Sequence, residues 1–199
     1  MTERSSESRN DAWGITPSQT VGPFYAYALT PARRYALSDL VTSNLVTEDA
    51  AGMRIRVEGR ILDGEGDPVT DAMVEIWQAD GEGRYPGADT NSQFTGFGRA
   101  ECDLEGRYMF DTVKPGRTPG PRGAMQAPHI NVGIFARGVT RRLFTRIYFA
   151  DEEANASDPV LSLVSADARG TLIARASGAG HYILDIRLQG DNETVFFEA

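Results

Sequence analysis

Residues 53–62 read MRIRVEGRIL, and the alternation within this stretch decides the fold class. The apolar residues Ile55, Val57 and Ile61 recur at a period of two, with charged residues between most of them. Successive side chains of a β-strand point to opposite faces of the sheet, so one face of this stretch is apolar and the other charged. The stretch therefore predicts a half-buried strand of an antiparallel sheet.

The same type of pattern recurs along the chain between turn signals such as DGEGDP at 63–68. The further predicted strands are rich in β-branched and aromatic residues: Ala72–Gln78, Arg107–Phe110, His129–Phe135, Arg142–Phe149, Tyr182–Leu188 and Thr194–Phe197. Only Pro159–Ser165 and Ala166–Ala176 favour short helices, and Thr30–Val46 fits neither pattern. We expect an all-β fold, an antiparallel β-sandwich or barrel with long loops and few short helices. Residues 1–15 are expected to form a flexible, extended N-terminal arm, and residues 16–199 the domain.

Composition excludes several classes of protein. The 199 residues carry 20 basic and 28 acidic side chains, a net charge of −8 that argues against nucleic-acid binding. The run Arg141, Arg142 and Arg146 is interpreted as a solvated strand face or a partner-facing patch. No apolar run approaches the roughly 20 residues that span a bilayer, and residues 1–10 are polar, so we expect a cytoplasmic protein. The single cysteine, Cys102, is expected to be a small buried residue.

A possible metal site is suggested by His129-Ile130-Asn131. Strand alternation places His129 and Asn131 on one face, opposite the apolar Ile130. A His-x-His pair here would be a strong metal signal, because both imidazoles would converge from one strand, and Asn131 breaks that pair. The second of the two histidines, His181, is expected to have a structural, hydrogen-bonded role.

Several motifs together resemble one family of enzymes. They are TPSQTVGPF at 16–24, VEIWQADGEGRY at 74–85, FTGFGRAECDLEGRYMFDTVKPG at 94–116, APHINVGIFARG at 127–138 and TRIYFADE at 145–152. The chain resembles the α subunits of the protocatechuate 3,4-dioxygenase group of intradiol ring-cleaving dioxygenases. The resemblance implies a subunit of an oxidoreductase that uses O₂ to open a catechol ring, protocatechuate, to 3-carboxy-cis,cis-muconate.

The resemblance also implies where iron is held. In this family a homologous β subunit holds Fe(III) with two tyrosines and two histidines. The matching positions here are Tyr85, Thr118, His129 and Asn131, so two of the four ligands are replaced. Thr118 offers only a neutral hydroxyl and Asn131 a weak amide oxygen, so these four positions are interpreted as vestigial and this chain as metal-free. We expect Fe(III) in the partner β subunit and no catalytic residue in this chain alone. Trp77 is expected to be a core aromatic residue.

The contribution expected from this chain is to the substrate pocket. The family resemblance assigns Thr20 and Pro23 of the TPSQTVGPF segment, and Arg137 of the FARG motif, to substrate binding. If the strand that starts at His129 runs unbroken, Arg137 lies on the same face as His129 and Asn131. Two alternatives remain: a β-sandwich binding module without enzymatic activity, and a self-sufficient catechol-type dioxygenase with rearranged ligands.

Overall fold

Nearly all of the chain forms one β-rich unit. The computed structural model describes residues 19–198 except 23, 34, 36 and 88–92. Within these residues, nine strands form one sheet in the order β11-β1-β10-β9-β8-β7-β2-β3, with β4 paired to β1 off this path. The strands of this sheet are β1 (Arg54–Leu62), β2 (Met73–Trp77), β3 (Phe97–Glu101), β4 (Arg107–Val113), β7 (His129–Phe135), β8 (Leu143–Phe149), β9 (Ile173–Ala176), β10 (His181–Ile183) and β11 (Ile186–Arg187). The short strands β5 (Thr118–Pro119) and β6 (Met125–Gln126) pair only with each other.

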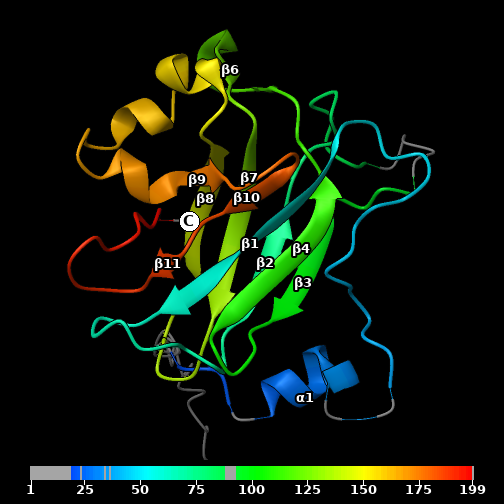
Figure 1. Cartoon of the computed structure of the whole chain (residues 1–199), viewed down its shortest axis with the longest axis vertical. Helices are drawn as coiled ribbons and strands as arrows, with labels where there is room; N and C mark the ends of the chain where they lie inside the picture. The colour runs from blue at the N-terminus through cyan, green and yellow to red at the C-terminus, as the bar shows by residue number, and fades with distance from the viewer. Residues whose placement is uncertain (1–18, 23, 34, 36, 88–92, 199) are drawn as a thin grey trace, which may run out of the picture.

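The sheet curls into two layers that face each other across the core (Figure 1). One layer contains β1 and β4, and the other contains β2, β3, β7 and β8. β9 joins them, because it pairs with β8 in parallel and with β10 in antiparallel fashion. The all-β class is confirmed. The sheet is mixed rather than purely antiparallel, because β1 also runs parallel to β10 and β11.

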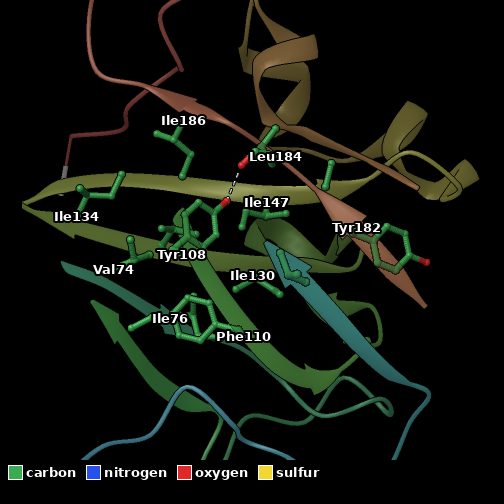
Figure 2. Packing of buried hydrophobic residues seen from close by; sticks show 14 of the residues in the cluster. Val74, Ile76, Tyr108, Phe110, Ile130, Ile134, Ile147, Tyr182, Leu184 and Ile186 are labelled. Atoms are coloured by element: carbon green, nitrogen blue, oxygen red, sulfur yellow. Dashed lines mark hydrogen bonds between the residues drawn. The ribbon is translucent and has the colours of Figure 1, made fainter. Parts of the chain in front are cut away.

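The core lies between the two layers. Phe110 of β4 faces Ile76 of β2 and Ile130 of β7 (Figure 2). Val57 of β1 belongs to the same cluster, and all four side chains are buried. Burying each such side chain stabilises the fold by about 1.5 to 3 kcal/mol. Tyr108 is also fully buried, and its hydroxyl donates to the Leu184 carbonyl at 2.7 Å, which satisfies the one polar atom of the ring.

Helical structure is minor in the described residues. The α-helix α1 (Tyr25–Leu29) has five residues, and the others are 3₁₀ turns. These turns are Pro31–Arg33, Pro121–Gly123, Glu153–Ser157, Leu161–Leu163 and Arg169–Leu172. The helix expected at Ala166–Ala176 was wrong in its second half, where Ile173–Ala176 forms β9. None of the helices described here has the length and apolar character needed to cross a membrane.

The predicted strands agree with most of the sheet. The predicted range His129–Phe135 coincides with β7, and Arg142–Phe149 differs from β8 by one residue. The prediction for Thr194–Phe197 was wrong, because this segment contributes only an isolated bridge between Phe197 and Phe144. The arm predicted for residues 1–15 lies outside the described residues.

Candidate functional site

Tyr85 and Asn131 lie side by side, as the motif comparison requires. The Asn131 side chain is half-buried on β7, opposite Trp77 of β2. Its Nδ2 donates to Tyr85 Oη at 3.1 Å and to the Trp77 carbonyl at 3.2 Å. Trp77 is 39% exposed and stacks on Tyr85 with ring centroids 5.7 Å apart, so the expectation of a core tryptophan was wrong. The Asn131 amide therefore presents its donor end, and not its oxygen, to Tyr85.

The loops that carry Tyr85 and Thr118 are pressed together at a glycine. Gly83 has a φ of +80°, and a Cβ placed there would lie 1.9 Å from the Arg117 carbonyl oxygen. Only glycine tolerates both the positive φ and this approach without displacing the backbone. The Gly-Arg-Tyr loop is thereby held against the loop that ends in Thr118, a residue that is 1% exposed.

His129 is buried and keeps one nitrogen without a partner. Its ring is 1% exposed, and Nδ1 lies 2.8 Å from the Ala127 carbonyl, so Nδ1 carries the proton and donates. Nε2 is then a buried acceptor that has no hydrogen-bond partner among the described residues. Burial, and after it the positive charge of Arg146, lowers the pKa of His129 from 6.5 to about 4. The imidazole is therefore neutral at pH 7.

Arg146 connects this cluster to Thr118. It lies on β8 directly opposite Asn131, so the two side chains share one face of the sheet. Arg146 Nη1 donates to Gln126 Oε1 at 2.8 Å and to Tyr148 Oη at 3.3 Å. Gln126 Nε2 in turn donates to Thr118 Oγ1 at 3.3 Å. Arg146 is half-buried and hydrogen-bonded here, so the solvated face expected for the arginine run is found at Arg141 and Arg142 and not at Arg146; the partner-facing alternative stays a prediction.

The buried carboxylate of Asp158 holds the segment that precedes His129. Asp158 is fully buried; its Oδ2 accepts from the Ala127 amide at 2.7 Å, and Oδ1 accepts from the Leu161 and Val160 amides at 2.6 and 2.9 Å. Tyr148 Oη also donates to Oδ1, at 3.1 Å, and burial raises the pKa of Tyr148 to about 12, so this phenol stays protonated. One carboxylate thus ties the segment before His129 to the 3₁₀ turns at 153–172.

Sequence comparisons establish the family. Residues 22–190 match the dioxygenase family. The chain is 46% identical to the protocatechuate 3,4-dioxygenase α chain of Burkholderia cepacia over 194 residues, which cover 92% of this chain and 96% of the relative. The chain belongs to the intradiol ring-cleaving dioxygenase family. To the protocatechuate 3,4-dioxygenase β chain of the same organism it is 37% identical over 171 residues, covering 78% of this chain and 73% of that one.

Solved structures of intradiol dioxygenases have the same fold. The crystal structure of catechol 1,2-dioxygenase from Pseudomonas arvilla C-1 superposes with a TM-score of 0.60 at 25% identity, covering 74% of this chain and 55% of that one. Hydroxyquinol 1,2-dioxygenase from Pseudomonas putida DLL-E4 also gives 0.60, at 23% identity, over 89% of this chain and 63% of that one. The family similarity therefore extends to the arrangement of the strands.

The cluster does not fit the ferric ion that the intradiol family implies. Tyr85 and His129 are present as one phenol and one imidazole. Thr118 and Asn131 supply a neutral hydroxyl that accepts from Gln126 and an amide that donates to Tyr85. Ferric iron is stabilised by anionic oxygen ligands, and a cationic guanidinium on the same face opposes it. Among the four positions of this intradiol dioxygenase chain, the orphan Nε2 of His129 is a donor atom still suited to a metal.

The second group of predicted site residues meets at the other end of β7. The amide of Gly138 donates to Thr20 Oγ1 at 2.7 Å, which fastens the N-terminal segment beside Arg137. The Arg137 guanidinium pairs with Asp71 through Nε, and the Arg137 side chain is 61% exposed. Pro23 lies outside the described residues. The structure thus brings together Thr20 and Arg137, which are more than 100 positions apart in the sequence.

The strand does not run unbroken to Arg137, because β7 ends at Phe135. The alternation that relates His129 to Asn131 therefore does not extend to Arg137. Phe135 pairs with Met73 and Asn131 with Trp77, so Arg137 lies beyond the opposite end of β7 from the Tyr85–Asn131 contact. Thr20 and Arg137 form a cluster separate from the four vestigial positions.

The two histidines do not form a joint site. His181 is on β10, and β9 and β8 lie between it and β7 in the sheet. Its Nε2 lies 3.2 Å from Glu58 Oε1 of the adjacent strand β1, and its backbone pairs with Arg56. His129 instead bonds to Ala127. This arrangement favours the structural role expected for His181.

Proposed function

We propose that the chain is the metal-free α subunit of a protocatechuate 3,4-dioxygenase that works with a homologous β subunit carrying Fe(III). The observation that carries the proposal is the pattern of identity together with the altered ligand set. The chain is 46% identical to an α chain and 37% identical to a β chain from one organism, and two of its four inherited ligand positions are Thr118 and Asn131. A self-sufficient dioxygenase would need an anionic ligand in place of Thr118.

In the proposed reaction both atoms of O₂ are inserted between the two hydroxyl-bearing carbons of protocatechuate, which gives 3-carboxy-cis,cis-muconate. The ferric ion of the β subunit would activate the bound catecholate toward O₂. The proposed task of this chain is to complete the pocket and to bind the ring substituent.

Thr20, Pro23 and Arg137 are the proposed substrate-binding residues. The Thr20–Gly138 hydrogen bond supports this assignment, because it holds Thr20 next to Arg137, the proposed cation of the pocket. Arg137 is largely exposed, so its charge is available to a ligand brought by another chain. Its pairing with Asp71 is an exposed ion pair of a kind that contributes about 0 to 1 kcal/mol, which a substrate carboxylate can replace.

The exposed apolar side chains before β1 also support a permanent partner. Phe24, Leu37 and Leu40 are 75, 63 and 88% exposed. They lie in a segment that follows Thr20 closely in sequence. Grouped apolar exposure of this kind is typical of surfaces that a partner covers.

The direct test is co-expression with a β-type chain that has Gly-Arg-Tyr, Lys-Pro-Gly-x-Tyr and His-x-His intact. We expect the purified complex to contain one iron for each αβ pair and to consume O₂ with protocatechuate. The chain alone, supplemented with ferric iron, is expected to bind no stoichiometric iron and to lack the reddish tyrosinate-to-iron absorption. One iron per isolated chain would contradict the proposal in favour of a self-sufficient enzyme. A failure to assemble with the β chain would favour a separate binding module.

A further inference from the structure

Arg146 is placed at the centre of the four vestigial positions. It faces Asn131 across the β7–β8 pair, and through Gln126 it is two hydrogen bonds away from Thr118. Its Nη1 also donates to Tyr148 Oη, and the Tyr148 ring lies 5.8 Å from the ring of His129. Arg146 thus lies opposite Asn131 and is connected to Thr118 through Gln126 and to His129 through Tyr148, which are three of the four positions.

The charge of Arg146 is not neutralised by an ion pair. Within the described part of the chain, no carboxylate oxygen lies within 4.0 Å of its guanidinium, whereas Arg56, Arg60 and Arg99 each have such a partner. The guanidinium donates to a neutral amide oxygen and to a phenol. The nearby carboxylate of Asp158 is engaged by Tyr148 Oη and by backbone amides. A half-buried positive charge therefore remains beside the inherited ligand atoms.

Two of the four positions still bring polar atoms close together, and a third keeps a free acceptor. Asn131 Nδ2 and Tyr85 Oη are 3.1 Å apart, and adjacent donor atoms of one metal ion with bonds of about 2.0 to 2.1 Å lie at a similar separation. His129 Nε2 is still an unpartnered, buried acceptor.

We infer that the Arg146 guanidinium, held by hydrogen bonds to Gln126 and Tyr148 beside the inherited ligand positions, excludes a metal cation from this chain by its charge. The inference rests on the proposed function only in taking the four positions as inherited ligand positions. Restoring a ligand is then insufficient for metal binding unless the charge of Arg146 is removed or neutralised as well. Repulsion between a half-buried guanidinium and a divalent cation is screened little by salt.

The test uses Co²⁺ as the probe, added to the assembled αβ complex with its iron in place. Asn131→His completes a His-x-His pair next to Tyr85. Alone, this variant is expected to bind no more Co²⁺ than the wild-type complex. Asn131→His with Arg146→Gln is expected to bind one additional Co²⁺ per chain, with an affinity about a hundredfold or more above that of Asn131→His alone. Calorimetry and the visible cobalt spectrum measure this binding.

A second combination neutralises Arg146 without replacing it. Gln126→Glu places a carboxylate where Gln126 Oε1 now lies, 2.8 Å from Arg146 Nη1. Asn131→His with Gln126→Glu is therefore also expected to bind the additional Co²⁺. Two variants made in the Asn131→His background serve as matched controls. Arg146→Lys keeps the positive charge, and Arg142→Gln removes a different arginine, whose guanidinium lies over the Phe144 ring. Neither control is expected to bind the additional ion.

The outcomes separate this inference from the proposed function. Tight Co²⁺ binding by Asn131→His alone would overturn it, as would the absence of binding in both neutralised combinations when assembly and partner iron are unchanged. The proposed function fails on a different readout, namely iron in the isolated wild-type chain.

Discussion

The two ends of β7 carry polar residues from the same motif, APHINVGIFARG, yet they are built in opposite ways. At the His129 end the polar groups are buried or half-buried and are hydrogen-bonded to one another around Arg146. At the Arg137 end the guanidinium is exposed and pairs with Asp71, while the next residue, Gly138, donates its amide to Thr20. At the first end most polar groups are paired within this chain, and the second end carries an exposed charge.

The difference shows how an inherited site changes its use. Once two ligands are lost, the remaining polar groups at the buried end still need partners, because an unpaired buried polar group is costly. Arg146, Gln126 and Asp158 supply most of these partners. At the other end the Arg137 side chain is exposed, so water can solvate its charge and no such cost arises. The predictions below test this division between a structural end and a functional end.

The largest effect is expected for Asp158→Ala at the buried end. Asp158 accepts three backbone amides and the Tyr148 hydroxyl, and its removal leaves those donors buried without acceptors. We expect the local free energy of unfolding around 127–135 to fall by about 3 to 5 kcal/mol. Hydrogen exchange of peptides from the assembled complex measures this. Asp71→Ala at the exposed end is the matched control and should cost about 1 kcal/mol or less. Similar losses in both variants would break the comparison.

The next effect is a pH dependence that belongs to the buried end. The folded pKa of His129, about 4, is below the ordinary histidine value of 6.5, so the unfolded state takes up the proton first. The stabilisation is present above pH 6.5 and is lost as the pH falls from about 6.5 to about 4, by roughly 2 to 4 kcal/mol. His129→Gln keeps a donor for the Ala127 carbonyl and removes the titration, so its local stability should depend less on pH in this window. His181→Gln should retain the wild-type pH dependence. A loss of that dependence in His181→Gln and not in His129→Gln would contradict the assignment of the titration to His129.

The sequence predicted the strands of this comparison better than their contacts. Alternation located β7 and β1, because burying one face of a strand imposes a period of two on its side chains. It did not locate the contacts of Arg146, which was interpreted as part of a solvated strand face or a partner-facing patch. A strand pattern says which residues share a face, but it does not say that a glutamine from β6 folds over that face and binds the arginine. Asp158 and Trp77 were missed for the same reason: their partners are set by loop packing that has no local period.

The resemblance of motifs pointed to four positions as inherited ligand positions. How these positions are spaced in the structure depends on contacts between loops that the motifs do not reveal. The contact of Gly83 with Arg117 joins two loops that are far apart in sequence. The end of β7 at Phe135 was likewise not visible, because Ala136 and Arg137 continue an acceptable strand pattern. Backbone register and strand ends are decided by tertiary pairing, which a single sequence does not contain.

The exposed end is tested most strongly by Arg137→Ala in the assembled complex. A charge-assisted contact with the carboxylate of protocatechuate contributes about 1.5 to 3 kcal/mol, which corresponds to a loss of about 10- to 150-fold in kcat/KM. Catechol has no carboxylate, so its kcat/KM should change little. Arg60→Ala, which removes the exposed partner of Asp185, is the matched control and should affect neither substrate. Equal losses for both substrates, with iron content unchanged, would make Arg137 a structural residue.

The smallest effect is expected for Thr20, whose hydroxyl accepts from the Gly138 amide at 2.7 Å. Thr20→Val keeps the shape of the side chain and removes this acceptor, and Thr20→Ser keeps the acceptor. One hydrogen bond of this kind is worth about 0.5 to 1.5 kcal/mol. We expect Thr20→Val to raise the KM for protocatechuate by about 2- to 12-fold through misplacement of the segment beside Arg137, and Thr20→Ser to behave like the wild type.

Combining Thr20→Val with Arg137→Ala sharpens the comparison further. If the hydroxyl acts by positioning the segment at Arg137, the double variant loses little more than Arg137→Ala alone, because neighbouring residues that share one role are not additive. If the two losses multiply in full, Thr20 contributes to the pocket independently of Arg137, and the exposed end consists of two separate determinants rather than one.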